Sequence, residues 1–457
     1  MIRTIRQLSE PALRVGYLEA GRGEPLVLIH GVGMNAETWY PQLDALSAHF
    51  RVIAVDMPGH GKSEGFAHAA TLEDYVRWMA AFLNTLDAPS VAVAGHSMGA
   101  LITAGLAIDY PERVNRAVVI MERTLPEESQ EKLYQEMIEL CELADRGGMH
   151  AIWTGEHHGM NFTIAPNPFI NLADIARRTS RVRLGTGTII APFNHPIRLA
   201  GEAAMTDIIT GGRLELGIAR GAYSYEYERL MPGLTAWDAG QRMRELIPAV
   251  KKLWQGDYAH QGEYWSFPAT TSSPLPKQQP HPPIWVAARD PNSHEFAVQN
   301  GCNVQVTPLH QGEEEIVRLV TCFNEARARF AADQPLKIML LQHGYVAEDE
   351  ADARLAAEEL NRFYHYFGAW FKNQRPVRQG LIQPLSDEEI AANTYYSADM
   401  MRANLAIGTA NEVITRLKKY EALGYDEFAL WIDSGMSFAR KKASLERFIR
   451  CVMPEFH

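Results

Sequence analysis

The sequence predicts an α/β protein with two parts. These are a short open parallel sheet over residues 1–116 and a TIM-type (β/α)8 barrel with insertions over residues 117–457. Short runs rich in Val, Ile, Leu and Ala alternate with amphipathic helical stretches along the chain, which is typical of parallel sheets. From residue 117 onward there are eight such runs, mostly separated by helix-like segments, and eight is the number of strands that closes this barrel.

Length and composition narrow the class of protein. A chain of 457 residues with 46% hydrophobic residues can bury more than one core. Its net charge of -11 gives little attraction for nucleic acid or anionic lipid, so we expect neither as a partner. The 4 cysteines form no CxxC pair, and residues 1–14 lack the apolar centre of a signal peptide. We therefore expect a cytoplasmic protein without disulfides.

The sequence pattern of the amino-terminal part predicts an open α/β unit. Its strand-like runs are residues 26–29, 51–55 and 91–94, and helix-like stretches cover residues 38–48 and 72–87. The third run ends in Gly95-His-Ser-Met-Gly99, which matches the G-x-S-x-G nucleophile elbow. Ser97 would be the nucleophile of such a site, with an oxyanion hole from amides near Gly31, Val32 and Met98.

Together with residues 30–33 and 56–63, this elbow resembles the first half of an α/β-hydrolase, over about residues 13–121. The base and acid of that fold follow the serine on later strands, and here the pattern changes after residue 120. We therefore expect Ser97 to be a relic. Two alternatives remain open, namely a bifunctional enzyme that hydrolyses an ester or lactone, and a non-catalytic interaction module.

The apolar run at residues 117–121 could belong to either part, and we assign it to the barrel. A barrel that lacks a strand exposes two edges, whereas an open sheet already has exposed edges.

Two connections, residues 221–283 and 347–427, are longer than a simple crossover needs, so we expect them to line the pocket or an oligomer interface. The barrel strands are expected at residues 117–121, 151–154, 183–190, 214–219, 284–287, 303–306, 338–346 and 428–432.

Polar residues gather where these strands end, which is the active face of such a barrel. Arg220 offers a planar fork for phosphate oxygens, and Ser293 opens a helix whose amide end suits a phosphate. Arg289 can share that phosphate or pair with Asp290. The strand-end residues are His157 and His158, Gly187 and Thr188, Arg220 and Gly221, and Arg289 with Asp290 and Ser293. They predict a concave site that binds the phosphate group of a ligand, and in which glycines let a flat part of that ligand lie close to the strand backbone. A metal at residues 156–158 is not expected, because adjacent side chains diverge.

Five segments together resemble the bacterial-luciferase-like flavin-dependent monooxygenases over about residues 117–457: residues 156–158, 184–192, 195–196, 211–221 and 407–409. The resemblance implies reduced FMN supplied by a separate NAD(P)H-dependent flavin reductase, molecular oxygen, a small organic substrate and a homodimer. A related branch uses deazaflavin, and this alternative stays open.

Residue by residue, the resemblance implies that His157 is the active-site histidine and that Arg220 and Ser293 hold the FMN phosphate. Gly187 and Thr188 match a position under the isoalloxazine that often has a non-proline cis peptide. Glu226 falls where luciferase has an acidic residue near the flavin. One departure is Ala219, since luciferase has a reactive cysteine there, which argues against light emission.

Overall fold

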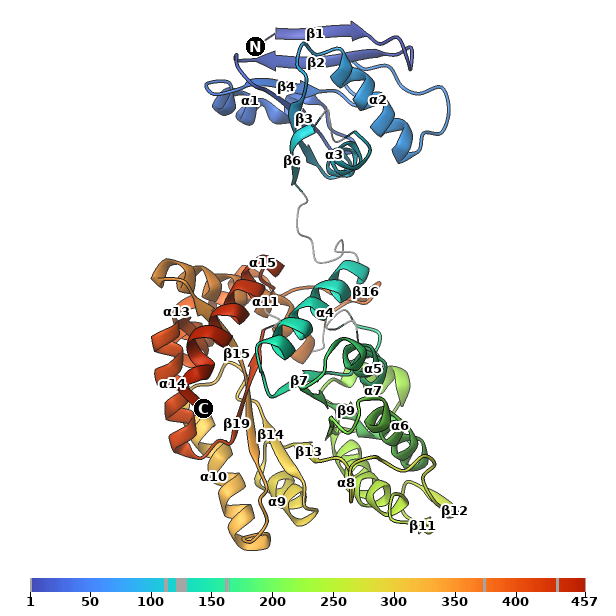
Figure 1. Ribbon diagram of the computed structural model, residues 1–457, viewed down its shortest axis with the longest axis vertical. Coiled ribbons are helices and arrows are strands. Elements are labelled where there is room, and N and C mark those ends of the chain that lie inside the picture. Colours follow the sequence, from blue (N-terminus) through green and yellow to red (C-terminus); the bar gives the residue numbers. More distant parts are fainter. Residues whose placement is uncertain are drawn as a thin grey trace. The chain divides into compact units, whose positions relative to one another are not determined.

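The computed structural model describes residues 2–110, 114–120, 130–160, 163, 165–372, 375–432 and 435–456. The chain divides into two compact units, Met1–Glu128 and Ser129–His457, and each is described by itself (Figure 1).

The amino-terminal unit is built on a six-stranded sheet in the order β1-β2-β4-β3-β5-β6. The strands β3, β4, β5 and β6 are parallel, and β1 and β2 add an antiparallel edge. Trp78 and Phe82 of α2 are fully buried with strand residues such as Val93, so this unit has its own core. Its elements are β1 (Ile2–Gln7), β2 (Arg14–Ala20), β3 (Pro25–Ile29), η1 (Ala36–Trp39), α1 (Tyr40–Leu46), β4 (Arg51–Val55), α2 (Leu72–Asn84), β5 (Val91–His96), α3 (Met98–Asp109) and β6 (Val114–Ile120).

The assignment of residues 117–121 to the barrel is wrong for the part of that run that the structure describes. β6 pairs in parallel with β5, so that Val93 lies opposite Ala117 and His96 opposite Ile120. The helix α3 is a crossover of ordinary length between two adjacent parallel strands, and this connection returns the chain to the open edge of β5. The amino-terminal sheet therefore extends to residue 120 and not to residue 116.

The second unit contains a nine-stranded sheet in which every pair is parallel, and its order runs β18-β15-β14-β13-β10-β8-β7, with β9 on β10 and β19 on β15. Within the described residues, β7 pairs only with β8 and β19 only with β15. All residues of these two edge strands are half-buried, whereas nearly all of β15 is buried. The strands are β7 (Ala151–Thr154), β8 (Arg183–Thr186), β9 (Ile189–Ile190), β10 (Leu214–Ala219), β13 (Ile284–Ala287), β14 (Asn303–Val306), β15 (Ile338–Ala347), β18 (Ala406–Thr409) and β19 (Glu427–Trp431).

Helices surround these strands, which lie inside the unit in Figure 1. Apolar strand residues such as Leu216, Val286 and Val304 form one core with the helices. The connecting helices are α4 (Gln130–Arg146), α5 (Pro168–Arg178), α6 (Pro196–Ile209), α8 (Ala236–Leu253), α9 (Pro291–Gln299), α10 (Glu313–Phe330), α14 (Ala410–Leu423) and α15 (Phe438–Arg447). The α/β class is thus confirmed.

The two long connections contain secondary structure of their own. The first holds α7 (Ser224–Leu230) and a hairpin of β11 (Tyr258–Gln261) with β12 (Ser266–Thr270). The second holds α11 (Glu350–Lys372), the short pair β16 (Val377–Arg378) and β17 (Leu381–Ile382), α12 (Asp387–Ala391) and α13 (Ala398–Asn404). None of the described helices combines the length and the apolar character that crossing a membrane requires.

Candidate functional site

His157 is held by a buried carboxylate from another part of the barrel. The residue follows β7, and its Nδ1 atom lies 3.1 Å from Oε2 of Glu226 on α7. The side chain of Glu226 is 0% exposed and that of His157 18% exposed. The other carboxylate oxygen accepts a hydrogen bond from the backbone amide of His158 at 2.8 Å. Glu226 therefore fixes both the ring and the backbone at the end of β7.

A second buried carboxylate, Glu156, joins the same loop to the next strand. Its Oε1 atom lies 2.7 Å from Nε2 of His158, and its Oε2 atom accepts a hydrogen bond from the amide of Ile190 at 2.8 Å. The hydrogen bond to Glu156 raises the pKa of His158. The sequence argues against Glu156 as a metal ligand and includes it in a segment that carries the family resemblance; in the structure its carboxylate lies between two strand ends.

Arg220 and Gly221 lie at the end of β10 and are positioned by Tyr227. The Tyr227 hydroxyl donates to the carbonyl oxygens of Arg220 at 2.8 Å and of Gly221 at 2.9 Å. Burial raises the pKa of Tyr227, so the phenol keeps the proton that it donates. Gly221 has a φ of +89°, and a Cβ atom there would lie 3.0 Å from Ile190, so this turn requires glycine.

The guanidinium of Arg220 is exposed and donates to the carbonyl oxygen of Ala236, where α8 begins, at 3.2 Å. Among the described residues, no carboxylate lies within ion-pair distance of it. Glu226 and Tyr227 are adjacent on α7, and one contacts His157 while the other contacts Arg220. The structure thus brings the predicted histidine and the predicted phosphate ligand together on one rim of the barrel.

Gly187 and Thr188, which are predicted to lie under a flat ligand, lie between His157 and Arg220. The peptide bond between Gly187 and Thr188 is cis, as the resemblance predicts. The amide of Gly187 donates to the carbonyl oxygen of Thr154 at 2.7 Å, which holds this segment against β7. A Cβ atom at Gly185 would lie 2.2 Å from the ring of Trp153, so the indole packs directly on the strand backbone.

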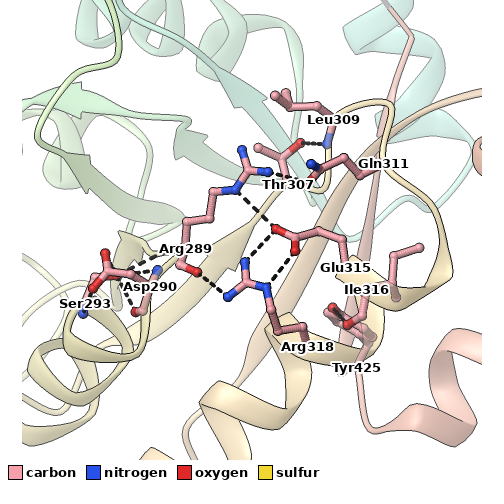
Figure 2. A network of polar contacts seen from close by, with 10 residues as sticks. All are labelled: Arg289, Asp290, Ser293, Thr307, Leu309, Gln311, Glu315, Ile316, Arg318 and Tyr425. Atoms are coloured by element: carbon pink, nitrogen blue, oxygen red, sulfur yellow. Dashed lines mark hydrogen bonds and ion pairs between the residues drawn. The ribbon is translucent and has the colours of Figure 1, made fainter. Parts of the chain in front are cut away.

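The start of α9 differs from the expectation, as Figure 2 shows. The Asp290 carboxylate accepts a hydrogen bond from the amide of Ser293 at 3.1 Å, and the Ser293 hydroxyl donates to the carbonyl oxygen of Asp290 at 2.7 Å. The amide and the hydroxyl that we expected to face a phosphate are therefore engaged by the helix's own N-cap.

Arg289 pairs with Glu315 and not with Asp290 (Figure 2). Its Nε atom donates to Glu315 at 3.2 Å, and another guanidinium nitrogen donates to Gln311 at 2.5 Å. Glu315 also accepts two hydrogen bonds from Arg318, at 2.6 and 2.7 Å, which lower its pKa. One carboxylate is thus shared by two guanidinium groups, and Arg289 can still offer positive charge at the rim.

The elbow at Ser97 has the predicted geometry. Ser97 lies between β5 and α3 with φ 53° and ψ -120°. A Cβ atom at Gly95 would lie 2.0 Å from the carbonyl oxygen of Gly99, and one at Gly99 would lie 2.2 Å from that of Ile29. Only glycine fits two positions before and two positions after the serine, as this tight turn requires.

Two histidines of the amino-terminal unit, His30 and His60, contact backbone groups. The Nε2 atom of His30 accepts a hydrogen bond from the amide of Met57 at 3.0 Å, and its Nδ1 atom lies 2.7 Å from the carbonyl oxygen of Gly31. His60 accepts from the amide of Gly33 and also contacts a carbonyl oxygen. Among these described residues, no hydrogen bond joins the Ser97 hydroxyl to an imidazole that could act as its base.

Two family models match the chain. The model described as luciferase-like monooxygenase matches residues 114–427, and that described as alpha/beta hydrolase fold matches residues 24–138. Both therefore include β6.

Two curated relatives match different parts of the chain, and both come from Acinetobacter baylyi. One is the oxygenase component of a flavin-dependent trigonelline monooxygenase, with 68% identity over 338 residues, or 74% of this chain and 94% of that protein. The other is (E)-2-((N-methylformamido)methylene)succinate hydrolase, with 53% identity over 104 residues, or 23% of this chain. The chain covers only 40% of this hydrolase.

Solved structures agree with the barrel fold. Monooxygenase RslO1 from Streptomyces bottropensis is 27% identical with a TM-score of 0.62, and the match covers 73% of this chain and 97% of that one. The oxygenating constituent of 3,6-diketocamphane monooxygenase from Pseudomonas putida, solved with FMN, is 18% identical with a TM-score of 0.58 over 73% of this chain and 95% of that one. At 18% identity the second likeness shows the fold alone.

Proposed function

Because the chain belongs to the luciferase-like monooxygenase family, we propose that it is the oxygenase component of a two-component system. It would use reduced FMN, delivered by a separate NAD(P)H-dependent flavin reductase, and molecular oxygen. One oxygen atom enters a small organic substrate and the other leaves as water, with two electrons from the reduced flavin. The observation that carries the proposal is the placement of His157, through Glu226 and Tyr227, on the same rim as Arg220.

The residues at the end of β10 fit a phosphate-tailed cofactor. Arg220 has an exposed guanidinium whose only partner among the described residues is one carbonyl oxygen, so donors remain for phosphate oxygens. Arg289 would add to this grip, and Gly187, Thr188 and Gly221 would let a flat ring approach the backbone. The Asp290 carboxylate would repel a phosphate at the start of α9, so we propose Arg220 as the main phosphate ligand.

The chain's own contribution to the reaction is to hold the flavin, exclude water and place a proton acceptor. The Glu226 carboxylate accepts the Nδ1 proton of His157, which leaves Nε2 as the basic nitrogen of the ring. In this arrangement His157 can take a proton from the substrate, and Glu226 stabilises the imidazolium that forms.

We propose that the substrate is an N-methylpyridinium carboxylate. Trigonelline is such a compound, and the relative that is named for it is 68% identical and 94% covered by this chain. Among the described residues of the amino-terminal unit, no imidazole hydrogen-bonds the Ser97 hydroxyl, which favours a non-catalytic part for that unit in this chain.

Oxygen uptake tests the proposed function directly. The full chain, FMN, a flavin reductase and NADH are mixed, and trigonelline should increase oxygen consumption and yield a product containing one atom of labelled molecular oxygen. Reductase without the chain is the control for flavin autoxidation. Uptake that trigonelline does not change would contradict the substrate, and oxygenation only with a reduced deazaflavin would contradict the cofactor.

The proposed homodimer is tested by light scattering of the purified chain. Twice the mass of the chain is expected, and a single-chain mass at working concentration would contradict it.

A further inference from the structure

A row of aromatic rings leads away from His157 across the active face. The ring of Tyr223 lies 5.3 Å from that of His157 and 5.3 Å from that of Phe371. The ring of Phe371 lies 4.9 Å from that of Phe367. Tyr223 lies in the loop between β10 and α7, whereas both phenylalanines belong to α11. Each contact is edge-on or tilted, the arrangement that aromatic pairs prefer.

The two phenylalanines of this row differ sharply in exposure. Phe367 is 2% exposed and Tyr223 is 4% exposed, so both are packed in the protein. Phe371 is 46% exposed although it touches the ring that contacts His157. A large apolar ring that is half open to solvent, and that is separated from His157 by one ring, is a ready contact surface for a substrate.

The charges around this row favour a cation. Glu226 and Glu156 are buried carboxylates at the strand end beside it, with side chains 0% and 7% exposed. Burial, and then the charge of Glu226, raise the pKa of Tyr223, so the Glu226 carboxylate acts on this ring. The faces of aromatic rings carry partial negative charge as well, and they attract cations within about 6 Å.

We propose that Phe371, backed by Tyr223, binds the planar cationic ring of the substrate by ring contact and cation–π attraction. This assigns Phe371 as a specificity-determining residue for N-alkylpyridinium compounds, and it rests on the proposed function. Aromatic carboxylates of the same shape whose ring carries no positive charge would lose the cation–π part of the contact. Their binding would therefore depend on Phe371 much less.

Calorimetric titration of the full chain with two ligands tests this assignment. Trigonelline carries the cation, and 3-methylbenzoate has nearly the same shape and the same carboxylate without it. Wild type should bind trigonelline at least about fivefold more tightly, and Phe371→Leu should weaken trigonelline binding by about fivefold or more. The binding of 3-methylbenzoate should change less than twofold. Trp237→Leu, which removes an aromatic ring 74% exposed on α8, is the matched control and should change neither ligand.

Phe371→Tyr keeps an aromatic face and should keep trigonelline affinity within about twofold. Equal weakening of both ligands by Phe371→Leu would overturn the cation–π assignment, and an unchanged trigonelline affinity would overturn any contact with Phe371. The two proposals fail separately. Binding that depends on Phe371 without oxygenation contradicts only the proposed function, whereas oxygenation with an unchanged KM in Phe371→Leu contradicts only this inference.

Discussion

The Nδ1 atom of His157 lies 3.1 Å from a carboxylate oxygen of Glu226, although 69 positions separate the two residues in the chain. A buried carboxylate in this position sets which ring nitrogen is basic and holds the ring in place. It also makes the pair one functional unit, in which each member depends on the other.

The first prediction concerns this pair. His157→Ala should lower kcat by about a hundredfold and Glu226→Gln by about tenfold, because general base catalysis contributes about 10²–10⁴-fold. The double variant should be no slower than His157→Ala alone, since Glu226 acts through the imidazole. Steady-state oxygen uptake measures this, with Glu228→Gln as a control, because Glu228 lies on the same helix with its side chain 66% exposed. Additive losses in the double variant would contradict the coupling.

The second prediction ranks the two arginines at the rim. Arg220→Ala should weaken FMN binding by about 10- to 100-fold, the value of a charge-assisted hydrogen bond of about 1.5–3 kcal/mol. Arg289→Ala should have a smaller effect, because Glu315 already shares its charge. Fluorescence titration of FMN against each variant measures both affinities. The opposite ranking would place the phosphate at α9.

The third prediction concerns acid stability and His343. This histidine is 1% exposed and stacks on Trp431 with ring centroids 4.0 Å apart, and burial lowers its pKa to about 3. The unfolded chain binds a proton at this residue below pH 6.5, while the folded chain does not until about pH 3, so stability falls as the pH falls through this window.

Protonation of His343 in the unfolded chain should lower the free energy of unfolding by about 2 kcal/mol between pH 7 and pH 5. Denaturant unfolding of wild type and His343→Phe at both pH values isolates it, because the other titrating groups are common to both proteins. The variant should lose about 2 kcal/mol less than wild type over this interval. Parallel losses would show that His343 does not titrate in this way.

The fourth prediction concerns the elbow. The full chain should not turn over a p-nitrophenyl ester above the rate of Ser97→Ala, because no imidazole reaches the Ser97 hydroxyl among the described residues. Turnover that disappears in Ser97→Ala would instead support the bifunctional alternative.

A different result is expected if the amino-terminal unit is a non-catalytic interaction module. Capture of a flavin reductase by the full chain should then depend on residues 1–120 and survive Ser97→Ala. Equal capture by a chain without those residues would contradict that alternative.

Much of the site could be predicted from sequence because its chemistry is local. The elbow at residues 95–99 needs glycines on both sides of one serine, and backbone sterics alone impose that. His157, Arg220 and Ser293 each follow an apolar run by a few residues, and parallel strands bring such positions to one end of a sheet. The cis peptide at Gly187 was expected from the resemblance and is present.

Partners far apart in the chain were not predictable in the same way. Glu226 comes from an insertion after β10, and the sequence contains no pattern that joins it to His157. The same holds for Arg289, because its partner Glu315 lies 26 positions further along the chain. The sequence does not single out Tyr223 and Phe371 for the same reason, although the three tyrosines in residues 223–227 are a signal that this segment faces inward.

The α/β class, the elbow and the order of polar residues along the strand ends follow from the amino-acid sequence, because these depend on local periodicity and on glycine sterics. The sheet that contains residues 114–120 is known only from the folded chain. Both family models include this run, and a short apolar run of this kind can form a strand of either sheet. Backbone pairing with β5 distinguishes the two, and pairing is a property of the neighbouring strand rather than of the run itself.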